Sequence, residues 1–516
     1  MSEWDAGSIN AITYTHGYCD ELNPLRSRLP LLLSGFVPQT VRTACELGFG
    51  HGISVNMHAA GSATPWFGTD YNPSHADFAR QLSGSAGSQA ALFAESFSAF
   101  CARDDLPQFD FIGMHGIWSW ISDEDRALIA DFIQRKLNVG GVVYVAYNTQ
   151  PGWAAMLPVR ELMHCHLQAR TRDSAPSSPA QAEAHVVEAV DFVRRVLDTQ
   201  PGYALVNPLV AERVDALRSE NPRYLAHEYF NRDWQPMSFS QVSASLTAAG
   251  LTYGCSADYR DHVDEINLNE AQRAMLAGIA DTALRETVRD FCTNRSMRRD
   301  YWVKAPQMLD MASRQKALRA HRVMLALPRA SVVLKVRGAL GEATLPESLY
   351  SPILDALASH RPTTLAEIES SVQGRAIPLP VIAKAVTLLT GAGVLLNVQD
   401  EGQIELARPL SERLNAAICE FALSQADVQF LASPVSGSGI ATSRLAQLFL
   451  LARRRQSGGP AQWAEFAGAA LRASQSSVGG AETVDAHLPN ADHELLEKAN
   501  RFGNTHLPIL QALGIA

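Results

Sequence analysis

The chain has 516 residues, more than a single hydrophobic core usually holds, so two or three packed units are expected. Hydrophobic residues make up 47% and charged residues 19%, the composition of an ordinary globular protein large enough to be an enzyme. The formal net charge of -9 offers no basic surface to a phosphate backbone, so nucleic acid is not an expected partner.

Seven cysteines are scattered along the chain, and no two of them form a Cys-x-x-Cys pair. This spacing argues against both a disulfide framework and a zinc site, so no metal is expected. The N-terminus lacks a basic start followed by an apolar run, and the apolar stretch 29–37 is too short to span a bilayer. A cytoplasmic protein without stable membrane insertion is therefore expected.

Short apolar runs alternate with helical patterns over the first 150 residues, which is typical of a parallel sheet covered by helices. Polar residues follow each expected strand, and ligands of open α/β sheets bind at the carboxyl ends of the strands, so a site is expected there. The expected strands are Val41–Leu47, Trp66–Thr69, Ala91–Ala94, Phe109–Met114 and Gly141–Ala146.

The sequence then becomes helical to about residue 220, which predicts a helical insertion over about 154–222. Sheet-like sequence returns at Leu251–Cys255 and Arg299–Lys304, which would supply strands six and seven. We therefore expect a doubly wound, seven-stranded, Rossmann-like α/β domain over 1–305, whose last part, about 223–305, follows the insertion.

The rest of the chain is expected to form a C-terminal α+β region. Three short helices and a hairpin predict a winged-helix-like middle domain over 306–400, followed by a mainly helical domain over 401–516. Only Lys384 is basic in the third of these helices, so docking or packing is favoured over DNA binding. The expected features are helices at Leu349–Ser359, after a Thr363 cap and at Pro378–Thr390, a strand at Val394–Val398 and a turn at Asp400–Gly402.

A glycine-rich segment, Glu46-x-Gly48-x-Gly50-x-Gly52, follows the first expected strand. Glycines are needed where the chain turns sharply and its backbone approaches a ligand closely. Asp70 stands 24 residues after Glu46, at the end of the next strand, where a carboxylate accepts hydrogen bonds from ribose hydroxyls. The pattern favours a nucleoside site over a purely structural turn.

The order of residues in this loop bears on its ligand. A dinucleotide loop reads G-x-G-x-x-G and sets a helix N-terminus against a pyrophosphate. Here an acidic residue comes first and the glycines follow as G-x-G-x-G. A carboxylate at Glu46 repels pyrophosphate but suits a cationic ligand with an amino group and a sulfonium, so S-adenosylmethionine is favoured.

Several segments resemble known proteins. Ala44–Gly52 with Gly68–Pro73 looks like motifs I and II of class I methyltransferases. Other segments are similar to the bacterial methyltransferases that carry a methyltransferase regulatory domain, among them the rickettsial lysine methyltransferases of outer-membrane proteins. These segments are His115–Trp120, Tyr147–Trp153, Tyr224–Asn231 and Leu431–Gly437. The resemblance covers most of the chain and is specific for family and cofactor, but says little about the substrate.

The resemblance implies how S-adenosylmethionine would be bound. The three loop glycines, Gly48, Gly50 and Gly52, would line its methionine part, Glu46 would order the loop, and Asp70 would hold the ribose. His51 departs from the small or acidic residue that is commoner between the last two glycines. Further implied contacts are Tyr71, then Glu95, Ser96 and Phe97 beside the adenine, then His115 and Gly116 near the sulfonium. Tyr14 and Tyr18 are separate candidates for cofactor contact, because the N-terminal segment could fold over the cofactor as a lid.

Methyl transfer is an in-line displacement that needs positioning and a neutral nucleophile. If the nucleophile is a lysine amine, with a solution pKa of about 10.4, it must lose its proton. His115, Tyr147 and Asn148 are expected at the ends of strands four and five and are candidates for accepting hydrogen bonds from it. Trp118 is a candidate wall for a cationic ammonium, with core packing as the alternative.

Three functions remain open at this point. The favoured one is methylation of a substrate protein, most plausibly on lysine, with an outer-membrane or surface protein before export as a possible substrate. The second is a methyltransferase acting on a small molecule or glycan. The third is a catalytically silent cofactor-binding scaffold. The helical insertion is a candidate surface for a homodimer.

Overall fold

The computed structural model describes residues 17–516 except 89, 173–175, 177, 457 and 478–490. Its centre is a seven-stranded sheet in the order β3-β2-β1-β4-β5-β7-β6. Strands β1 to β5 pair in parallel, and β7 runs antiparallel between β5 and β6. The strands are β1 (Ala44–Leu47), β2 (Trp66–Thr69), β3 (Ala91–Phe93), β4 (Phe109–Met114), β5 (Leu137–Asn148), β6 (Leu251–Ser256) and β7 (Met297–Lys304). The expected doubly wound α/β sheet is confirmed.

Helices cover both faces of this sheet. Because successive side chains of a strand point to opposite faces, alternate residues of β5 enter two different cores. Val143, Val145 and Tyr147 enter one core, and Val142, Tyr144 and Ala146 enter the other. The Tyr147 side is covered by α4 (Phe97–Cys101), α5 (Asp123–Lys136) and α12 (Phe239–Ala248), and the Tyr144 side by α1 (Pro24–Leu33), α2 (Ile53–Ser62) and α3 (Pro73–Ala86).

The strand order reverses between β1 and β4, since the chain runs from β1 to β2 and β3 on one side and from β4 to β5 on the other. Ligands of open α/β sheets bind at such a switch point, outside the carboxyl ends of the strands. Glu46 of β1 is in register with Gly68 of β2 and Gly113 of β4. The loops that follow these three strands therefore meet at one edge.

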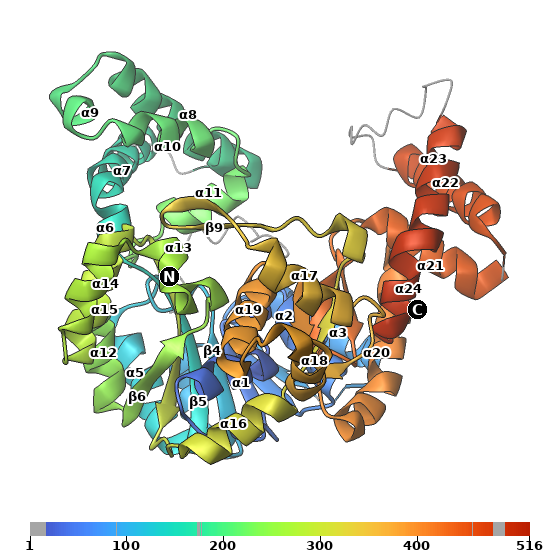
Figure 1. Ribbon diagram of the computed structural model, residues 1–516. Coiled ribbons are helices and arrows are strands. Elements are labelled where there is room, and N and C mark those ends of the chain that lie inside the picture. The colour runs from blue at the N-terminus through green and yellow to red at the C-terminus, as the bar shows by residue number, and fades with distance from the viewer. Residues whose placement is uncertain (1–16, 89, 173–175, 177, 457, 478–490) are drawn as a thin grey trace.

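The helical insertion has a hydrophobic core of its own, which includes Trp153, Val190, Val214 and Trp234. It projects from the end of the sheet at the upper left of Figure 1. Its helices are α6 (Gln150–Trp153), α7 (Leu157–Thr171), α8 (Pro179–Asp198), α9 (Gly202–Val206), α10 (Leu209–Leu217) and α11 (Pro222–Tyr229). Helices α13 (Asp264–Asn267), α14 (Glu270–Ala277) and α15 (Thr282–Thr293) then lead to β7.

The middle of the chain contains the three expected short helices, but no hairpin follows the third of them among the described residues; the hairpin of this region, Lys335–Gly338 with Gly341–Thr344, comes before the first. Thr364, one residue after the expected cap, caps the second helix. The expected turn at Asp400–Gly402 is wrong, because Asp400 precedes a 21-residue helix, α20. The strand before it, β12, pairs instead with β8. The elements are α16 (Met311–Ala320), β8 (Arg322–Leu325), β9 (Lys335–Gly338), β10 (Gly341–Thr344), α17 (Glu347–Ala356), β11 (Thr363–Thr364), α18 (Leu365–Ser371), α19 (Leu379–Gly391) and β12 (Leu395–Asn397).

The C-terminal region packs against the helix that follows the glycine loop. Every residue of α2 from Ile53 to Gly61 is buried, and its apolar residues belong partly to the sheet core and partly to the C-terminal core. A Cβ on Gly61 would lie 2.9 Å from the Gly437 carbonyl carbon, so the β13–β14 hairpin rests directly on α2. The C-terminal elements are α20 (Glu401–Phe421), β13 (Phe430–Ser433), β14 (Ser438–Ala441), α21 (Arg444–Gln456), α22 (Pro460–Ser477), α23 (Ala491–Arg501) and α24 (Leu507–Ala512).

A buried ionic network joins β7 to α15. Arg298 is 5% exposed and its guanidinium reaches the carboxylates of Glu286, Asp290 and Asp300 at 3.0, 2.9 and 3.0 Å. Tyr147 of β5 donates a hydrogen bond to Asp300 at 2.9 Å. One buried cation thus contacts three carboxylates, and burial raises the pKa of Asp290 to about 6.

This raised pKa predicts a pH dependence of stability. A carboxyl whose pKa is higher in the folded than in the unfolded chain stabilises the fold at low pH, and this contribution is lost as the pH rises through about 6. Compared with Asp290→Asn, the wild type should lose up to about 3 kcal/mol of unfolding free energy between pH 4 and pH 7. Denaturant titrations across this range measure it. Parallel pH profiles for the two proteins would contradict the prediction, and the exposed Asp131→Asn on α5 serves as the control.

Candidate active site

The three loop glycines all have left-handed backbone conformations, with φ of +73° at Gly48, +56° at Gly50 and +70° at Gly52. Non-glycine residues rarely adopt this region, so the turn between β1 and α2 requires the glycines that the sequence places there. The Gly48 N–H donates to the Thr69 carbonyl at 2.8 Å, and the Gly50 N–H donates to Asp70 Oδ2 at 2.9 Å. The loop is thereby tied to the end of β2.

The surroundings of the glycines differ. A Cβ on Gly48 would lie 2.1 Å from the Ile117 side chain, and one on Gly52 would lie 2.5 Å from the Ala79 Cβ. A Cβ on Gly50 would meet nothing within 4 Å. Gly48 and Gly52 therefore allow close packing against the following loop and α3, whereas Gly50 borders open space.

Glu46 carries a buried carboxylate at the end of β1. It is 3% exposed, and no described residue lies within hydrogen-bonding distance of its Oε2 atom. Burial, reinforced by the charge of Asp70, raises the pKa of Glu46 well above its usual value. A buried carboxylate oxygen without a donor is costly, and a cationic or hydrogen-bond-donating ligand would satisfy it.

Asp70 lies at the end of β2 and is 7% exposed. Its Oδ2 atom accepts from the Gly50 N–H, and its Oδ1 atom accepts from the Asn72 N–H at 3.0 Å and contacts His75 Nδ1 at 3.3 Å. A carboxylate has about four acceptor sites, so capacity for a further donor remains. Tyr71 is the next residue and is half-buried.

The loop after β3 carries the residues expected beside an adenine. Ser96 caps α4 by accepting from the Ala99 N–H at 3.3 Å. Glu95 is half-buried and forms an ion pair with Arg103 at 2.8 Å. Phe97 begins α4, and its ring tip lies 4.0 Å from the position of a Cβ on Gly48. Phe97 is thus the residue of this group that the structure brings to the glycine loop.

The loop after β4 contains His115 and Gly116. Gly116 has φ +63°, and a Cβ on it would meet nothing within 4 Å, as at Gly50. His115 is half-buried, and burial lowers its pKa to about 4, so the ring is neutral at pH 7. Its Nδ1 atom lies 2.8 Å from the Tyr144 hydroxyl.

The structure does not bring the other expected catalytic residues to this loop as a group. Trp118 is fully buried in the core on the Tyr147 side of the sheet, which agrees with the packing alternative. Tyr147 lies in the same core and its hydroxyl is bound to Asp300. Asn148 ends β5 and is 4% exposed, and its side-chain nitrogen has no hydrogen-bond partner among the described residues.

Tyr18 points toward the C-terminal region. Its hydroxyl accepts from the Gly439 N–H at 2.8 Å, lies 3.0 Å from His58 Nε2 and donates to Asp20 at 3.2 Å. Tyr14 lies outside the described residues. The expected contact of Tyr18 with a cofactor would therefore require a rearrangement of these three bonds.

Sequence reasoning missed four residues around His115. Cys19 Sγ lies 3.0 Å from His115 Nδ1, and Glu21 accepts from that thiol at 3.2 Å. Tyr144 and Arg299 complete the group, with Arg299 3.6 Å from the Glu21 carboxylate. The sequence holds one signal for Tyr144. Successive side chains of a strand alternate between the two faces of the sheet, so Tyr144 and Tyr147, three residues apart in the fifth strand, must lie on opposite faces.

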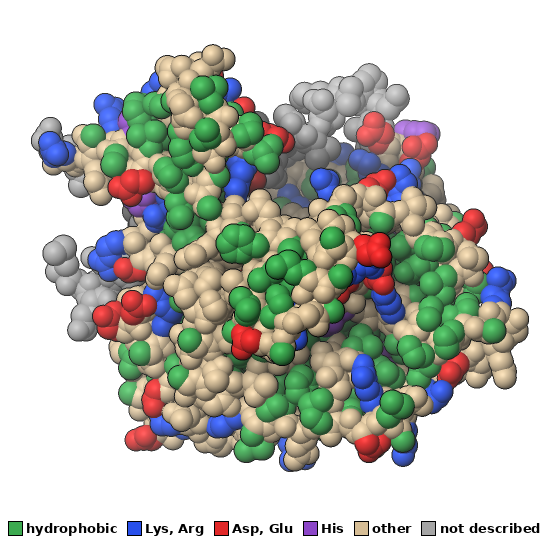
Figure 2. All heavy atoms as spheres, turned by 60° about the vertical axis from the view of Figure 1, so that its left-hand side comes forward, with side chains coloured by type: hydrophobic (Ala, Val, Ile, Leu, Met, Phe, Trp, Pro, Cys, Tyr) green, Lys and Arg blue, Asp and Glu red, His purple; other side chains and the backbone are tan. Residues whose placement is uncertain are grey.

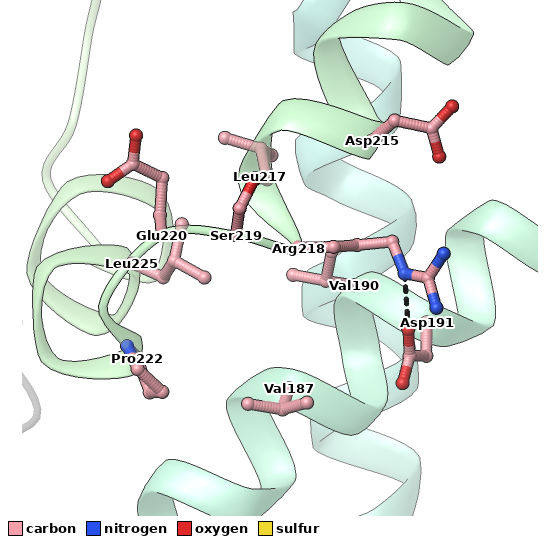
Figure 3. A pocket seen from close by; sticks show the side chains of 10 residues that line it. All are labelled: Val187, Val190, Asp191, Asp215, Leu217, Arg218, Ser219, Glu220, Pro222 and Leu225. Atoms are coloured by element: carbon pink, nitrogen blue, oxygen red, sulfur yellow. Dashed lines mark hydrogen bonds and ion pairs between the residues drawn. The ribbon is translucent and has the colours of Figure 1, made fainter. Parts of the chain in front are cut away.

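Two pockets lie away from the glycine loop. One, of about 360 Å³, lies in the helical insertion and is shown in Figure 3, where Arg218 pairs with Asp191 at 2.8 Å beside the apolar residues Val187 and Leu225. The other, of about 370 Å³, lies between α5 and α12. Among the described residues, no cluster of three or more His, Cys, Asp or Glu is arranged to hold a metal ion.

Comparison with known proteins places the chain in a family. Residues 221–304 match the model of a predicted methyltransferase regulatory domain, which confirms that resemblance. The protein sll1526 of Synechocystis is 35% identical over 521 residues, which span 99% of this chain and 100% of that protein. The chain belongs to the sll1526 family. Protein RP789 of Rickettsia prowazekii is 31% identical over 134 residues, which span 25% of this sll1526-family chain and 24% of RP789.

A solved structure supports the fold of this sll1526-family protein. PKMT2 from Rickettsia typhi, in complex with AdoHcy, matches with a TM-score of 0.68 at 16% identity, over 97% of this chain and 100% of that one. The match confirms the Rossmann-like methyltransferase fold and extends beyond the sheet into the middle and C-terminal regions.

Proposed function

We propose that this sll1526-family protein transfers a methyl group from S-adenosylmethionine to a lysine side chain of a substrate protein. The observation that carries the proposal is the open space at Gly50, whose N–H donates to the Asp70 carboxylate, in the loop that directly follows Glu46 with its unpartnered Oε2 atom. A site with two carboxyl groups beside a half-buried glycine backbone suits a cationic nucleoside and disfavours a pyrophosphate. The fold match to a protein in complex with AdoHcy, the product of methyl donation, supports it.

The residues present fit the cofactor. Glu46 would accept from its amino group, Gly48 and Gly50 would line its methionine part, and Asp70 would accept from the ribose hydroxyls. Phe97 would lie against the adenine. Bound there, S-adenosylmethionine supplies a methyl group already activated by the sulfonium charge.

The chain's own contribution to the reaction is to position a neutral amine and keep water away from it. His115 is neutral at pH 7, so it can accept a hydrogen bond from the amine without repelling it. Lysine as the acceptor is supported by the resemblance of 115–120 and 147–153 to the rickettsial lysine methyltransferases. The substrate would be a protein that is modified before export to the cell surface.

The proposal includes a homodimer in the cytoplasm. Large hydrophobic side chains are exposed on the helical insertion, where Leu205, Val206 and Leu209 are 72%, 76% and 66% exposed, and Figure 2 shows green side chains gathered there. A second copy of the insertion would cover them. All seven cysteines are free, which fits a reducing compartment. No described helix has the length and apolarity needed to cross a bilayer.

Incubating the purified protein and a cell lysate with S-adenosylmethionine labelled on its methyl group tests the proposal. Label is expected in protein and, after hydrolysis, in methylated lysine. Label confined to small molecules or glycan would reject the protein substrate, and no transfer at all would reject the activity.

A further inference from the structure

The four contacts around His115 and Cys19 define a small hydrogen-bond network. His115 Nδ1 lies 2.8 Å from the Tyr144 hydroxyl and 3.0 Å from Cys19 Sγ. Cys19 Sγ also lies 3.2 Å from Glu21 Oε2 and 3.7 Å from the Tyr144 hydroxyl. The imidazole ring is parallel to the Tyr144 ring within 3°, with their centres 6.0 Å apart.

Glu21 fixes the direction of this network at one end. Burial raises its pKa, but the attraction of Arg26 and Arg299 prevails, so the pKa of Glu21 lies below its usual value and the group is ionised. An ionised carboxylate only accepts, so the Cys19 thiol must donate its single proton to Glu21. The pKa of Cys19 is raised by burial, which keeps this proton on the thiol.

The remaining protons have one arrangement that places a hydrogen in every contact. The thiol proton is used at Glu21, so the 3.0 Å contact between Cys19 Sγ and His115 Nδ1 needs a hydrogen on Nδ1. The single Nδ1–H is then shared between Cys19 Sγ and the Tyr144 hydroxyl, and this hydroxyl donates its own proton toward Cys19 Sγ. If Tyr144 donated to Nδ1 instead, two lone pairs would face each other across the 3.0 Å contact.

We propose that Cys19 and Tyr144 are positioning residues that hold His115 as the Nδ1–H tautomer and leave the Nε2 lone pair to accept a hydrogen bond from the amine to be methylated. A neutral imidazole has one donor and one acceptor nitrogen, and the partner of one nitrogen decides the state of the other. No described residue bonds Nε2. The part concerning the amine rests on the proposed function, whereas the tautomer does not.

The tautomer can be measured without cofactor or turnover. Nitrogen NMR of the protein labelled with ¹⁵N-histidine, with His115 assigned through a His115→Asn variant, should show a protonated Nδ1 and an unprotonated Nε2 at pH 7. In Tyr144→Phe and in Cys19→Ala the Nε2–H form should become populated. Tyr144→Phe keeps the ring that packs against Tyr301, so its fold should persist.

Kinetics provide a second readout. Each variant should lower kcat by roughly 10-fold, less than the roughly 100-fold or more that a positioned proton acceptor contributes, because His115 itself is kept, with little change in KM for S-adenosylmethionine. Cys19→Ser should restore most of the activity because a hydroxyl also donates and accepts. Cys101→Ala and Tyr350→Phe, both buried outside the four-contact network, serve as matched controls and should keep wild-type kcat.

The possible outcomes separate this inference from the proposed function. A wild-type protein that transfers methyl groups but carries the His115 proton on Nε2 would overturn the inference and leave the proposed function standing. A wild type with Nδ1–H that transfers no methyl group would overturn the proposed function, and with it the assignment of Nε2 to an amine. A normal kcat in Tyr144→Phe would also overturn the inference.

Discussion

A Gly50→Val variant is expected to lose affinity for S-adenosylmethionine by at least about 100-fold. A β-branched residue at φ +56° is strained, and its side chain would project into the open space beside Gly50. Equilibrium binding of radiolabelled S-adenosylmethionine to the variant measures this loss.

A control must show that the loss of affinity comes from a side chain filling the cofactor site and not from backbone strain alone. Gly393 also has a left-handed backbone, with φ +72°, and a Cβ there would meet nothing within 4 Å, but it lies between α19 and β12. Gly393→Val should lower the free energy of unfolding by about 1–2 kcal/mol, as the same strain does in Gly50→Val. It should leave the affinity for S-adenosylmethionine unchanged. Equal affinities in Gly50→Val and the wild type would mean that the cofactor does not approach this loop.

The second large effect is on stability. Arg298→Met is expected to lower the free energy of unfolding by about 3–5 kcal/mol, because it leaves Asp290 and Asp300 buried without their ion pair and removes the nearest cation of Glu286. Urea titration at pH 7 measures the loss. Combining it with Asp290→Asn should recover part of the stability, since one uncompensated charge is then removed.

Arg285→Met is the matched control for this variant. Arg285 also lies near Glu286, at 3.7 Å, but its side chain is 35% exposed, so water screens the pair. Its loss should cost under about 1 kcal/mol. If Arg298→Met and Arg285→Met lowered the free energy of unfolding by the same small amount, the network would have no special role in holding β7 against α15.

The sequence predicted the sheet well, because buried parallel strands and the glycines between them leave strong local signals. All seven strands were expected near their observed positions, including the two after the insertion. The left-handed turn at Gly48 to Gly52 was equally readable, since glycine is the residue that such a backbone requires.

Other features depend on contacts between distant segments and could not be predicted in this way. Cys19 and Glu21 reach His115 from a short N-terminal turn that carries no motif. Tyr147 is a candidate because it stands at the end of the fifth strand, yet its side chain points to the face opposite that of Tyr144. The turn expected at Asp400–Gly402 has the composition of a hairpin, but packing of α20 on α2 and α3 extends a helix from there.

Calorimetric titration of the purified protein with S-adenosylhomocysteine tests the central claim most directly. The open space at Gly50 with its two carboxylates predicts saturable binding at one site per chain, and no competing binding of a nicotinamide dinucleotide. Absence of any heat of binding with S-adenosylhomocysteine, or tighter binding of the dinucleotide, would contradict the account.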